Sequence, residues 1–197
     1  MSISRRNPVL PILVLCIAVL LLVIGSSWLS GTNVNAQQDK DSFDVEQRLR
    51  DLGIELHDSA TPVANYVNAV SVGNLVFLAG HGPLISEGNY ITGKVGSDIS
   101  LEEGREAARL TTIDILSTLK AEIGDLNKVK RIVKVLGLVN CDPSFTDQPK
   151  VMNGFSDLIV SVFGESRGKH ARSAVGVASL YADISVEIEM IVELKEE

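Results

Sequence analysis

The sequence predicts an α+β domain in which two helices pack on one face of a β-sheet. Segments rich in β-branched residues lie in pairs near both ends of the domain, which predicts a hairpin at each end. Two segments between these pairs carry apolar residues at steps of three and four, the spacing of an amphipathic helix. A sheet of this kind buries one face under its helices. The expected order is strand, strand, helix, strand, helix, strand, strand.

The first 36 residues are set apart from this domain. Arg5 and Arg6 precede an uncharged apolar run over 9–24, and residues 34–36 (VNA) offer small side chains at the spacing of a cleavage site. A secretory signal peptide is the favoured interpretation. An uncleaved membrane anchor is the alternative, because residues 9–29 reach the roughly 20 residues that span a bilayer. In both cases the two arginines place the domain outside the cytoplasm, secreted, periplasmic or anchored.

Residues 37–44 are polar and predict a short linker, so the domain spans residues 45–197. Removing Arg5 and Arg6 with the leader lowers the basic count from 18 to 16 against 25 acidic residues, a formal charge of −9. This balance disfavours nucleic acid as a partner, because phosphate contacts need a concentrated basic face. Cys141 is the one cysteine outside the leader, so no internal disulfide is expected.

The N-terminal half of the domain predicts a short helix and then a hairpin. Residues 45–52 have helical spacing and are followed by Gly53, which suits a C-cap. Residues 67–80 contain two β-rich runs that meet at Gly73-Asn74, a two-residue turn. A glycine-rich loop follows, with one short strand expected around Tyr90.

The first long helix begins at a capping box, in which Ser100 is followed three residues later by Glu103, and it ends at Gly124. Residues 129–139 are mostly apolar or β-branched and predict a buried central strand. Pro149 begins a second helix, because the first turn of a helix does not need its N–H.

The C-terminal part of the domain predicts a loop at 164–169 and then strands at 172–180 and 184–194. In the last strand apolar and polar residues alternate, so one face is expected to be core and the other polar.

Standard catalytic patterns are mostly absent from this sequence. His57, His81 and His170 lie far apart, with no cysteine or carboxylate at the spacing of metal ligands, and predict no zinc site. Ser156 and Ser173 lack an obvious histidine and aspartate partnership.

Arg172 begins a strand whose other residues are mostly apolar or small. One interpretation is an arginine at a sheet edge that reaches water along its stem. The alternative is a guanidinium held in a pocket to bind a carboxylate, because a buried arginine without an anion is costly. A salt bridge with Glu187 in the last strand would satisfy the charge without a ligand.

Five segments, in the correct order, resemble the Rid/YjgF family. The resemblance covers roughly residue 52 to the C-terminus and rests on GKHARSAVGVASL with VEIEMIVEL, and on PVANYVNAVSVGNLVFLAGHGP, GKVGSDISLEEGREAARLTTIDIL, GDLNKVKRIVKVLGLVN and VMNGFSDLIVSVFGE. It implies a chorismate-mutase-like fold with a mixed sheet, and a homotrimer with ligand clefts between subunits. It also implies the hydrolysis of 2-imino or 2-enamino acids to 2-keto acids and ammonia, with no metal or organic cofactor.

The resemblance also assigns roles to individual residues. Arg172 matches the arginine that holds the substrate carboxylate, and Glu187 matches the glutamate that positions the attacking water. Tyr66 matches the tyrosine that closes the cleft, and Asn153 matches an asparagine of the cleft. Ala174 stands where a cysteine is frequent and is expected beside the substrate.

The chain departs from the family pattern at several positions. Ala79-Gly80-His81 replaces a common Ser-Gly-Gln, and Leu180-Tyr181 replaces a Leu-Pro pair. These differences and the leader suggest a divergent, exported subgroup. Three functions therefore stay open: an extracytoplasmic deaminase, a non-catalytic trimer that binds small carboxylic acids, and, disfavoured by the negative charge, an endoribonuclease.

Overall fold

The computed structural model describes residues 43–59, 62, 64–86 and 88–196. The predicted leader (1–36) and nearly all of the predicted linker (37–44) lie outside the described residues. Residues 44–197 form one compact unit. Within the described ranges, no helix combines the length and the apolar character needed to cross a bilayer.

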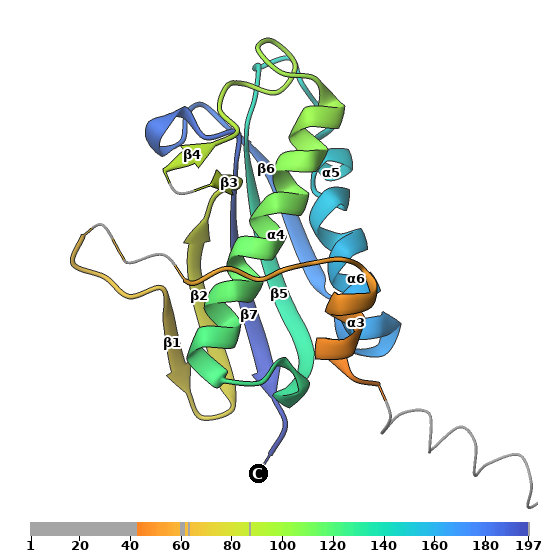
Figure 1. Ribbon diagram of the computed structural model, residues 1–197. Coiled ribbons are helices and arrows are strands. Elements are labelled where there is room, and N and C mark those ends of the chain that lie inside the picture. The colour runs from red at the N-terminus through yellow and green to blue at the C-terminus, as the bar shows by residue number, and fades with distance from the viewer. Residues whose placement is uncertain (1–42, 60–61, 63, 87, 197) are drawn as a thin grey trace, which may run out of the picture. The chain divides into compact units, whose positions relative to one another are not determined.

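Five strands form one mixed sheet in the order β1-β2-β7-β5-β6 (Figure 1). Strand β6 runs parallel to β5, and the other neighbours are antiparallel. A parallel pair needs a crossover, which the helical segment between β5 and β6 supplies. The strands are β1 (Ala69–Val72), β2 (Leu75–His81), β5 (Val129–Asn140), β6 (Ala171–Val177) and β7 (Val186–Leu194). A separate two-stranded sheet pairs β3 (Leu84–Ser86) with β4 (Asn89–Tyr90).

Helices cover one face of the five-stranded sheet (Figure 1). The long helix α4 (Leu101–Ile123) crosses the sheet and packs beside α6 (Asn153–Gly168). The α+β class, the helices on one face, the order of the main elements and the N-terminal hairpin are therefore confirmed. The hairpin expected at the C-terminal end is wrong, because β5 lies between β6 and β7 and pairs with both. The core between the layers is apolar and fully buried; it includes Val76, Leu116, Leu119, Ile132, Val135, Phe155, Ile159, Ile188, Met190 and Val192.

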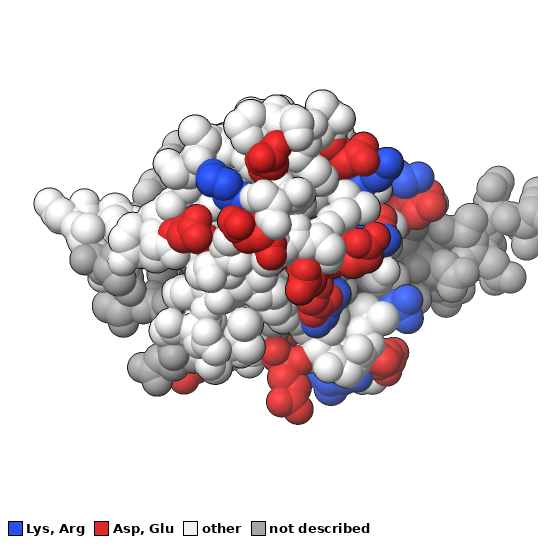
Figure 2. Space-filling model, turned by 90° about the horizontal axis from the view of Figure 1, so that it is seen from above, with Lys and Arg blue, Asp and Glu red and all other residues white. Residues whose placement is uncertain are grey.

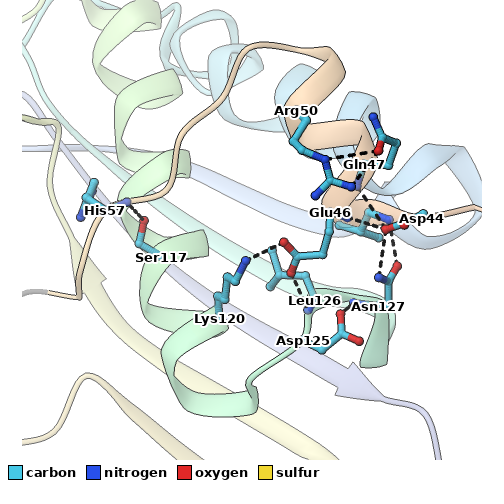
Figure 3. A network of polar contacts seen from close by, with 11 residues as sticks. Asp44, Glu46, Gln47, Arg50, His57, Ser117, Lys120, Asp125, Leu126 and Asn127 are labelled. Atoms are coloured by element: carbon cyan, nitrogen blue, oxygen red, sulfur yellow. Dashed lines mark hydrogen bonds and ion pairs between the residues drawn. The ribbon is translucent and has the colours of Figure 1, made fainter.

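The short helix α3 (Val45–Asp51) is attached to the rest of the domain by polar contacts (Figure 3). Asp44 caps it by accepting hydrogen bonds from the backbone N–H groups of Glu46 and Gln47, at 2.9 and 3.1 Å. Asn127 joins the cap from outside, because its amide donates to Asp44 and its oxygen accepts from the Val45 N–H. The chain that follows α3 then crosses α4, where the His57 N–H donates to Ser117 Oγ.

The second predicted helix differs from expectation in two ways. Pro149 does lie in the first turn, but that turn belongs to a short helix, α5 (Gln148–Val151), and the long helix α6 begins after Met152. The loop expected at 164–169 is helical as far as Gly168. Gly164 has φ 73° and ψ 166°, a non-helical conformation that glycine adopts at little cost, so it divides the helix into two segments at a kink.

Gly154 controls the approach of α6 to α4. A Cβ at this position would overlap the backbone oxygen of Arg105. In an unhindered helix interior alanine is favoured over glycine by about 1 kcal/mol. Here we expect Gly154→Ala to lower the free energy of unfolding by about 2 kcal/mol or more, because the added methyl group overpacks the contact.

Urea unfolding of the purified chain measures this effect. Ser166→Ala is the control, since Ser166 is exposed on the same helix and should change the stability by less than about 0.5 kcal/mol. Equal or higher stability of Gly154→Ala would contradict the close approach of the two helices.

Candidate functional site

A cavity of about 360 Å³ lies where strand β2 continues beyond its neighbour β1. The pairing of β1 with β2 ends at Ala69 and Leu78, and a register shift between Leu78 and His81 marks a bulge against β7. Bulges redirect side chains and are frequent next to functional sites. The wall of the cavity brings together segments that are far apart in the sequence: Tyr66, Asn68, Gly80, His81, Gly82, Tyr90, Asp114, Tyr181, Ile184 and Glu187.

Glu187 and Tyr66 are the two predicted site residues that line this cavity. Glu187 is half-buried on β7, and burial, helped by the nearby charge of Glu189, raises the pKa of its carboxyl. Its side chain lies against Gly80, where a Cβ would overlap the carboxyl group. A carboxyl group whose pKa is moved toward neutrality can accept and return a proton during a reaction.

Asp114 of helix α4 is a second carboxyl in the cavity, and no sequence motif indicates it. Burial raises its pKa, while the nearby rings of His81 and His57 act in the opposite direction. Its Oδ1 accepts no hydrogen bond from the part of the chain that the structure describes, and His57 Nε2 lies 3.4 Å away. A buried carboxyl oxygen without a hydrogen bond is energetically unfavourable.

His81 is part of the helix-covered side of the cavity. Its Nδ1 lies 2.7 Å from the Ala79 carbonyl oxygen, which can only accept, so this nitrogen carries a hydrogen. Its Nε2 lies 2.8 Å from Thr118 Oγ1, and burial lowers the pKa of the ring. The neutral ring therefore accepts a hydrogen bond from the Thr118 hydroxyl, and both its nitrogens are satisfied within the domain.

Arg172 and Asn153, two other predicted site residues, form a second cluster at the edge of the sheet. The guanidinium of Arg172 donates to Asn153 Oδ1 at 3.1 Å, to Ser156 Oγ at 2.9 Å and to the Pro149 carbonyl oxygen at 3.2 Å. These three acceptors are neutral. Burial lowers the pKa of Arg172, an effect that the charge of Asp157 opposes. An arginine nevertheless stays protonated in a protein, so the cluster carries a positive charge.

Ser156 and His170 hold this cluster in place, although their spacing in the sequence does not indicate a partnership. His170 Nδ1 lies 2.6 Å from the Gly168 carbonyl oxygen and must carry the hydrogen, so Nε2 is free to accept one from Ser156 Oγ at 3.1 Å. The hydroxyl oxygen of Ser156 is thereby turned toward Arg172. The ring of His170 packs edge-on against Phe155, with 5.7 Å between centroids. The return of the chain from α6 into β6 makes this contact, which no motif indicates.

Arg172 and Glu187 lie on opposite faces of the sheet. Arg172 is in register with Val135 and Met190, which are buried beneath the helices. Glu187 is in register with Leu138 on the other face, and β5 separates its strand from β6. The strands that carry Arg172 and Glu187 are therefore two strand spacings apart, roughly 10 Å. The salt bridge considered between Arg172 and Glu187 is therefore wrong.

Ala174 lies on β6 opposite Gly137, two residues beyond Arg172 and on the same face. It contributes a small side chain and no polar group. No group of three or more His, Cys, Asp or Glu side chains gathers as a metal site within the described ranges. On the face drawn in Figure 2, basic side chains lie beside acidic ones rather than in a patch of their own.

Comparisons with known proteins agree with this fold. The family described as "YjgF/chorismate_mutase-like, putative endoribonuclease" matches residues 46–186. Protein TCP17 of Trypanosoma cruzi is 45% identical over 150 residues, which cover 76% of this chain and 94% of that protein.

Solved structures give the same result. Protein Atu1372 of Agrobacterium tumefaciens, of unknown function, is 43% identical, with a TM-score of 0.70 and coverage of 77% of this chain and 94% of that one. A "putative endoribonuclease" from Shewanella oneidensis is 30% identical, with a TM-score of 0.73 and coverage of 77% and 99%. With its mixed sheet, its helix-covered face and these relatives, the chain belongs to the YjgF/chorismate-mutase-like (Rid) family.

Proposed function

We propose that this protein is an extracytoplasmic deaminase that hydrolyses 2-imino or 2-enamino acids to 2-keto acids and ammonia. One observation carries the proposal: Arg172 is held at the edge of the sheet by three neutral oxygens, with no carboxylate bound to it in the described part of the chain. The positive charge is positioned but not neutralised. A small carboxylic acid supplies the missing anion.

Arg172 suits a carboxylate because a guanidinium presents parallel N–H groups to the two oxygens of the ligand. Its contacts with Ser156 and Asn153 fix the plane of the group before a ligand arrives. This preorganisation reduces the entropy lost on binding. The carboxylate of an imino acid held in this way leaves its C2 carbon in a defined position.

Glu187 supplies the proton transfers that hydrolysis needs. Water adds to C2, and as the C–O bond forms, the π electrons of C=N move to nitrogen, which takes a proton through Glu187. The second proton of the water follows the same route as the C–N bond breaks, so ammonia leaves and the 2-keto acid remains. The raised pKa of Glu187 favours both directions of this transfer near neutral pH. An enamine enters the same sequence after it tautomerises to the imine.

A substrate that contacts both Arg172 and Glu187 requires a second copy of the chain, because the two residues face opposite sides of one sheet. The face without helices carries exposed apolar side chains: Val70, Val72, Phe77 and Val175. An apolar sheet face of this kind favours self-association. We place the active site between subunits of a homotrimer, with the Arg172 cluster of one subunit facing the cavity of the next.

The N-terminal segment is the basis for placing this activity outside the cytoplasm. Its apolar run follows Arg5 and Arg6, an order that keeps the N-terminus inside. The substrate would then come from an amino-acid or amine oxidase that acts outside the cytoplasm. Fractionation of cells that produce the full chain tests this proposal, and recovery of the protein from the cytosol alone would contradict it.

We predict that Phe77→Glu converts the trimer to a monomer. Phe77 is 41% exposed on the helix-free face, and a carboxylate there would have to be buried without a partner at the interface. Sedimentation velocity should give three times the chain mass for the unmodified protein and one chain mass for the variant.

Ile85→Glu is the control for this experiment. Ile85 is also apolar and 55% exposed, but it lies on β3, outside the five-stranded sheet, so the variant should stay trimeric. A stable monomer of the unmodified chain at micromolar concentration would contradict both the trimer and the shared site.

We predict that Arg172→Ala weakens the binding of a 2-keto acid ten- to a hundred-fold, as expected when a charge-assisted hydrogen bond of about 1.5–3 kcal/mol is lost. Arg172→Lys should restore little, because an ammonium group does not reproduce the planar fork. Calorimetric titration with 2-oxobutanoate measures the affinities. Arg109→Ala removes an equal charge from the surface of α4 and should leave the affinity unchanged.

Turnover separates the deaminase from a non-catalytic carboxylate-binding trimer. The protein is mixed with an amino-acid oxidase and leucine, and the decay of the imine is followed. Faster decay that requires Arg172 and Glu187 supports the enzyme. If the protein binds 2-oxobutanoate but does not accelerate the decay of the imine, its function is that of a non-catalytic carboxylate-binding protein. Equal affinity of folded Arg172→Ala and unmodified protein would contradict both.

A further inference from the structure

The cavity beside β2 is acidic and aromatic. The carboxyl groups of Asp114 and Glu187 line it, together with the rings of Tyr66, Tyr90 and Tyr181. None of its described lining residues is a lysine or an arginine. In contrast to the Arg172 cluster, this cavity is therefore complementary to positive charge.

Asp114 is the residue that most needs a partner. It is 6% exposed, and its Oδ1 accepts no hydrogen bond within the described ranges. The contact with His57 Nε2 at 3.4 Å is an ion pair only when that ring is protonated. Leaving a buried carboxyl oxygen without a donor costs about 1–3 kcal/mol, and more when it is charged. A ligand that brings a donor with positive charge would recover this cost.

Other ligand classes fit the cavity less well. An anion would meet two carboxyl groups and no basic side chain. A metal ion would lack a ligand set, because no group of three His, Cys, Asp or Glu side chains gathers in the described part of the chain. His81 is already engaged with Ala79 and Thr118. Tyrosine rings, in contrast, attract organic cations through their π-faces.

We propose that this cavity binds an organic cation, an ammonium or guanidinium group, and that Asp114 is its anchor. The inference rests on the proposed function in one respect: the cation is taken to be the side chain of the imino acid whose C2 carbon lies near Glu187. The preferred substrates are then 2-imino acids with a basic side chain. Their carboxylate binds Arg172, and their cationic end binds Asp114.

Burial separates the roles of the two carboxyl groups in this cavity. Asp114 is almost completely buried on α4, whereas Glu187 is half-buried on β7. The deeper group anchors the end of the side chain, and the more accessible group meets the water. A volume of about 360 Å³ accommodates a chain of a few methylene groups with a guanidinium at its end.

Agmatine tests the cation site without a carboxylate or a reaction. It is titrated by calorimetry into the unmodified chain and into Asp114→Asn, a variant of equal shape without the charge. We expect Asp114→Asn to weaken the binding about ten- to a hundred-fold. Glu106→Gln is the control, because it makes the same change of charge on the exposed side of α4 and should have no effect. Thermal unfolding of the three proteins establishes that each is folded.

Turnover tests the substrate class. An amino-acid oxidase supplies the imino acids of arginine and citrulline, which differ in a guanidinium and a neutral urea group of almost the same shape. The ratio of the two kcat/KM values does not depend on the fraction of active protein. We expect the unmodified chain to favour the imino acid of arginine at least ten-fold, and Asp114→Asn to bring the ratio close to one.

The outcomes distinguish this inference from the proposed function. If no imino acid is hydrolysed, including that of leucine, the deaminase proposal fails, and agmatine binding alone decides the cation site. If imino acids are hydrolysed but the ratio is near one and insensitive to Asp114→Asn, the inference fails while the deaminase stands. Agmatine binding that is absent, or equal in the two proteins, overturns the cation site.

Discussion

Side chains alternate strictly between the two faces of the sheet along strand β7, and this alternation fixes both the core and the position of Glu187. This strand lies between β2 and β5 in the sheet. Val186, Ile188, Met190 and Val192 are buried beneath the helices, so every residue between them must face the other way. Glu187 is therefore carried to the helix-free face, next to Gly80, by the same packing that forms the core. A one-residue slip of register would exchange the core with the site.

The helix-covered face imposes the opposite condition on Arg172. Its backbone belongs to an edge strand, and its side chain extends toward α5 and α6 rather than directly into water. Three of its N–H groups donate to neutral oxygens, and no carboxylate is hydrogen-bonded to it within the described residues. The charges of Arg172 and Glu187 thus have opposite sign, and their side chains lie on opposite faces of the sheet. A substrate with a carboxylate and a cationic end would need both Arg172 and the acidic cavity. Substrate recognition in our proposal therefore depends on assembly of the trimer.

Helix α4 shows why a buried face can hold more than apolar residues. Thr111, Thr112 and Ser117 are buried with their hydroxyl groups bonded to the carbonyl oxygen four residues earlier, so they are satisfied within the helix. Asp114 lies among them, and its Oδ1 has no such hydrogen bond. The three hydroxyl residues are hydrogen-bonded within the helix and serve in packing. Asp114 has a carboxyl oxygen without a hydrogen bond, which makes it a candidate binding residue on the same helix.

Local sequence patterns were enough to predict the class of the fold and most of its elements. Capping of α4 by Ser100 and Glu103, the turn at Gly73-Asn74 and the alternation in β7 are local effects, and each was predictable because its physical cause lies within a few residues. The loop expected over 164–169 is helical after the kink at Gly164, because a glycine can either end a helix or interrupt it, and only packing against the neighbouring elements decides between these outcomes.

The residues that make up the two clusters come together only through long-range packing and strand pairing. Ser156 and His170 meet Arg172 because the chain turns from α6 into β6, and Asp114 meets Tyr66 and Glu187 because β2 continues beyond β1. The resemblance to the Rid/YjgF family indicated four site residues, Arg172, Asn153, Tyr66 and Glu187. It did not indicate their division between opposite faces of the sheet. That division follows from strand order and register, which depend on hydrogen bonds between segments as far apart as β2 and β7. No local pattern in the sequence records these long-range pairings.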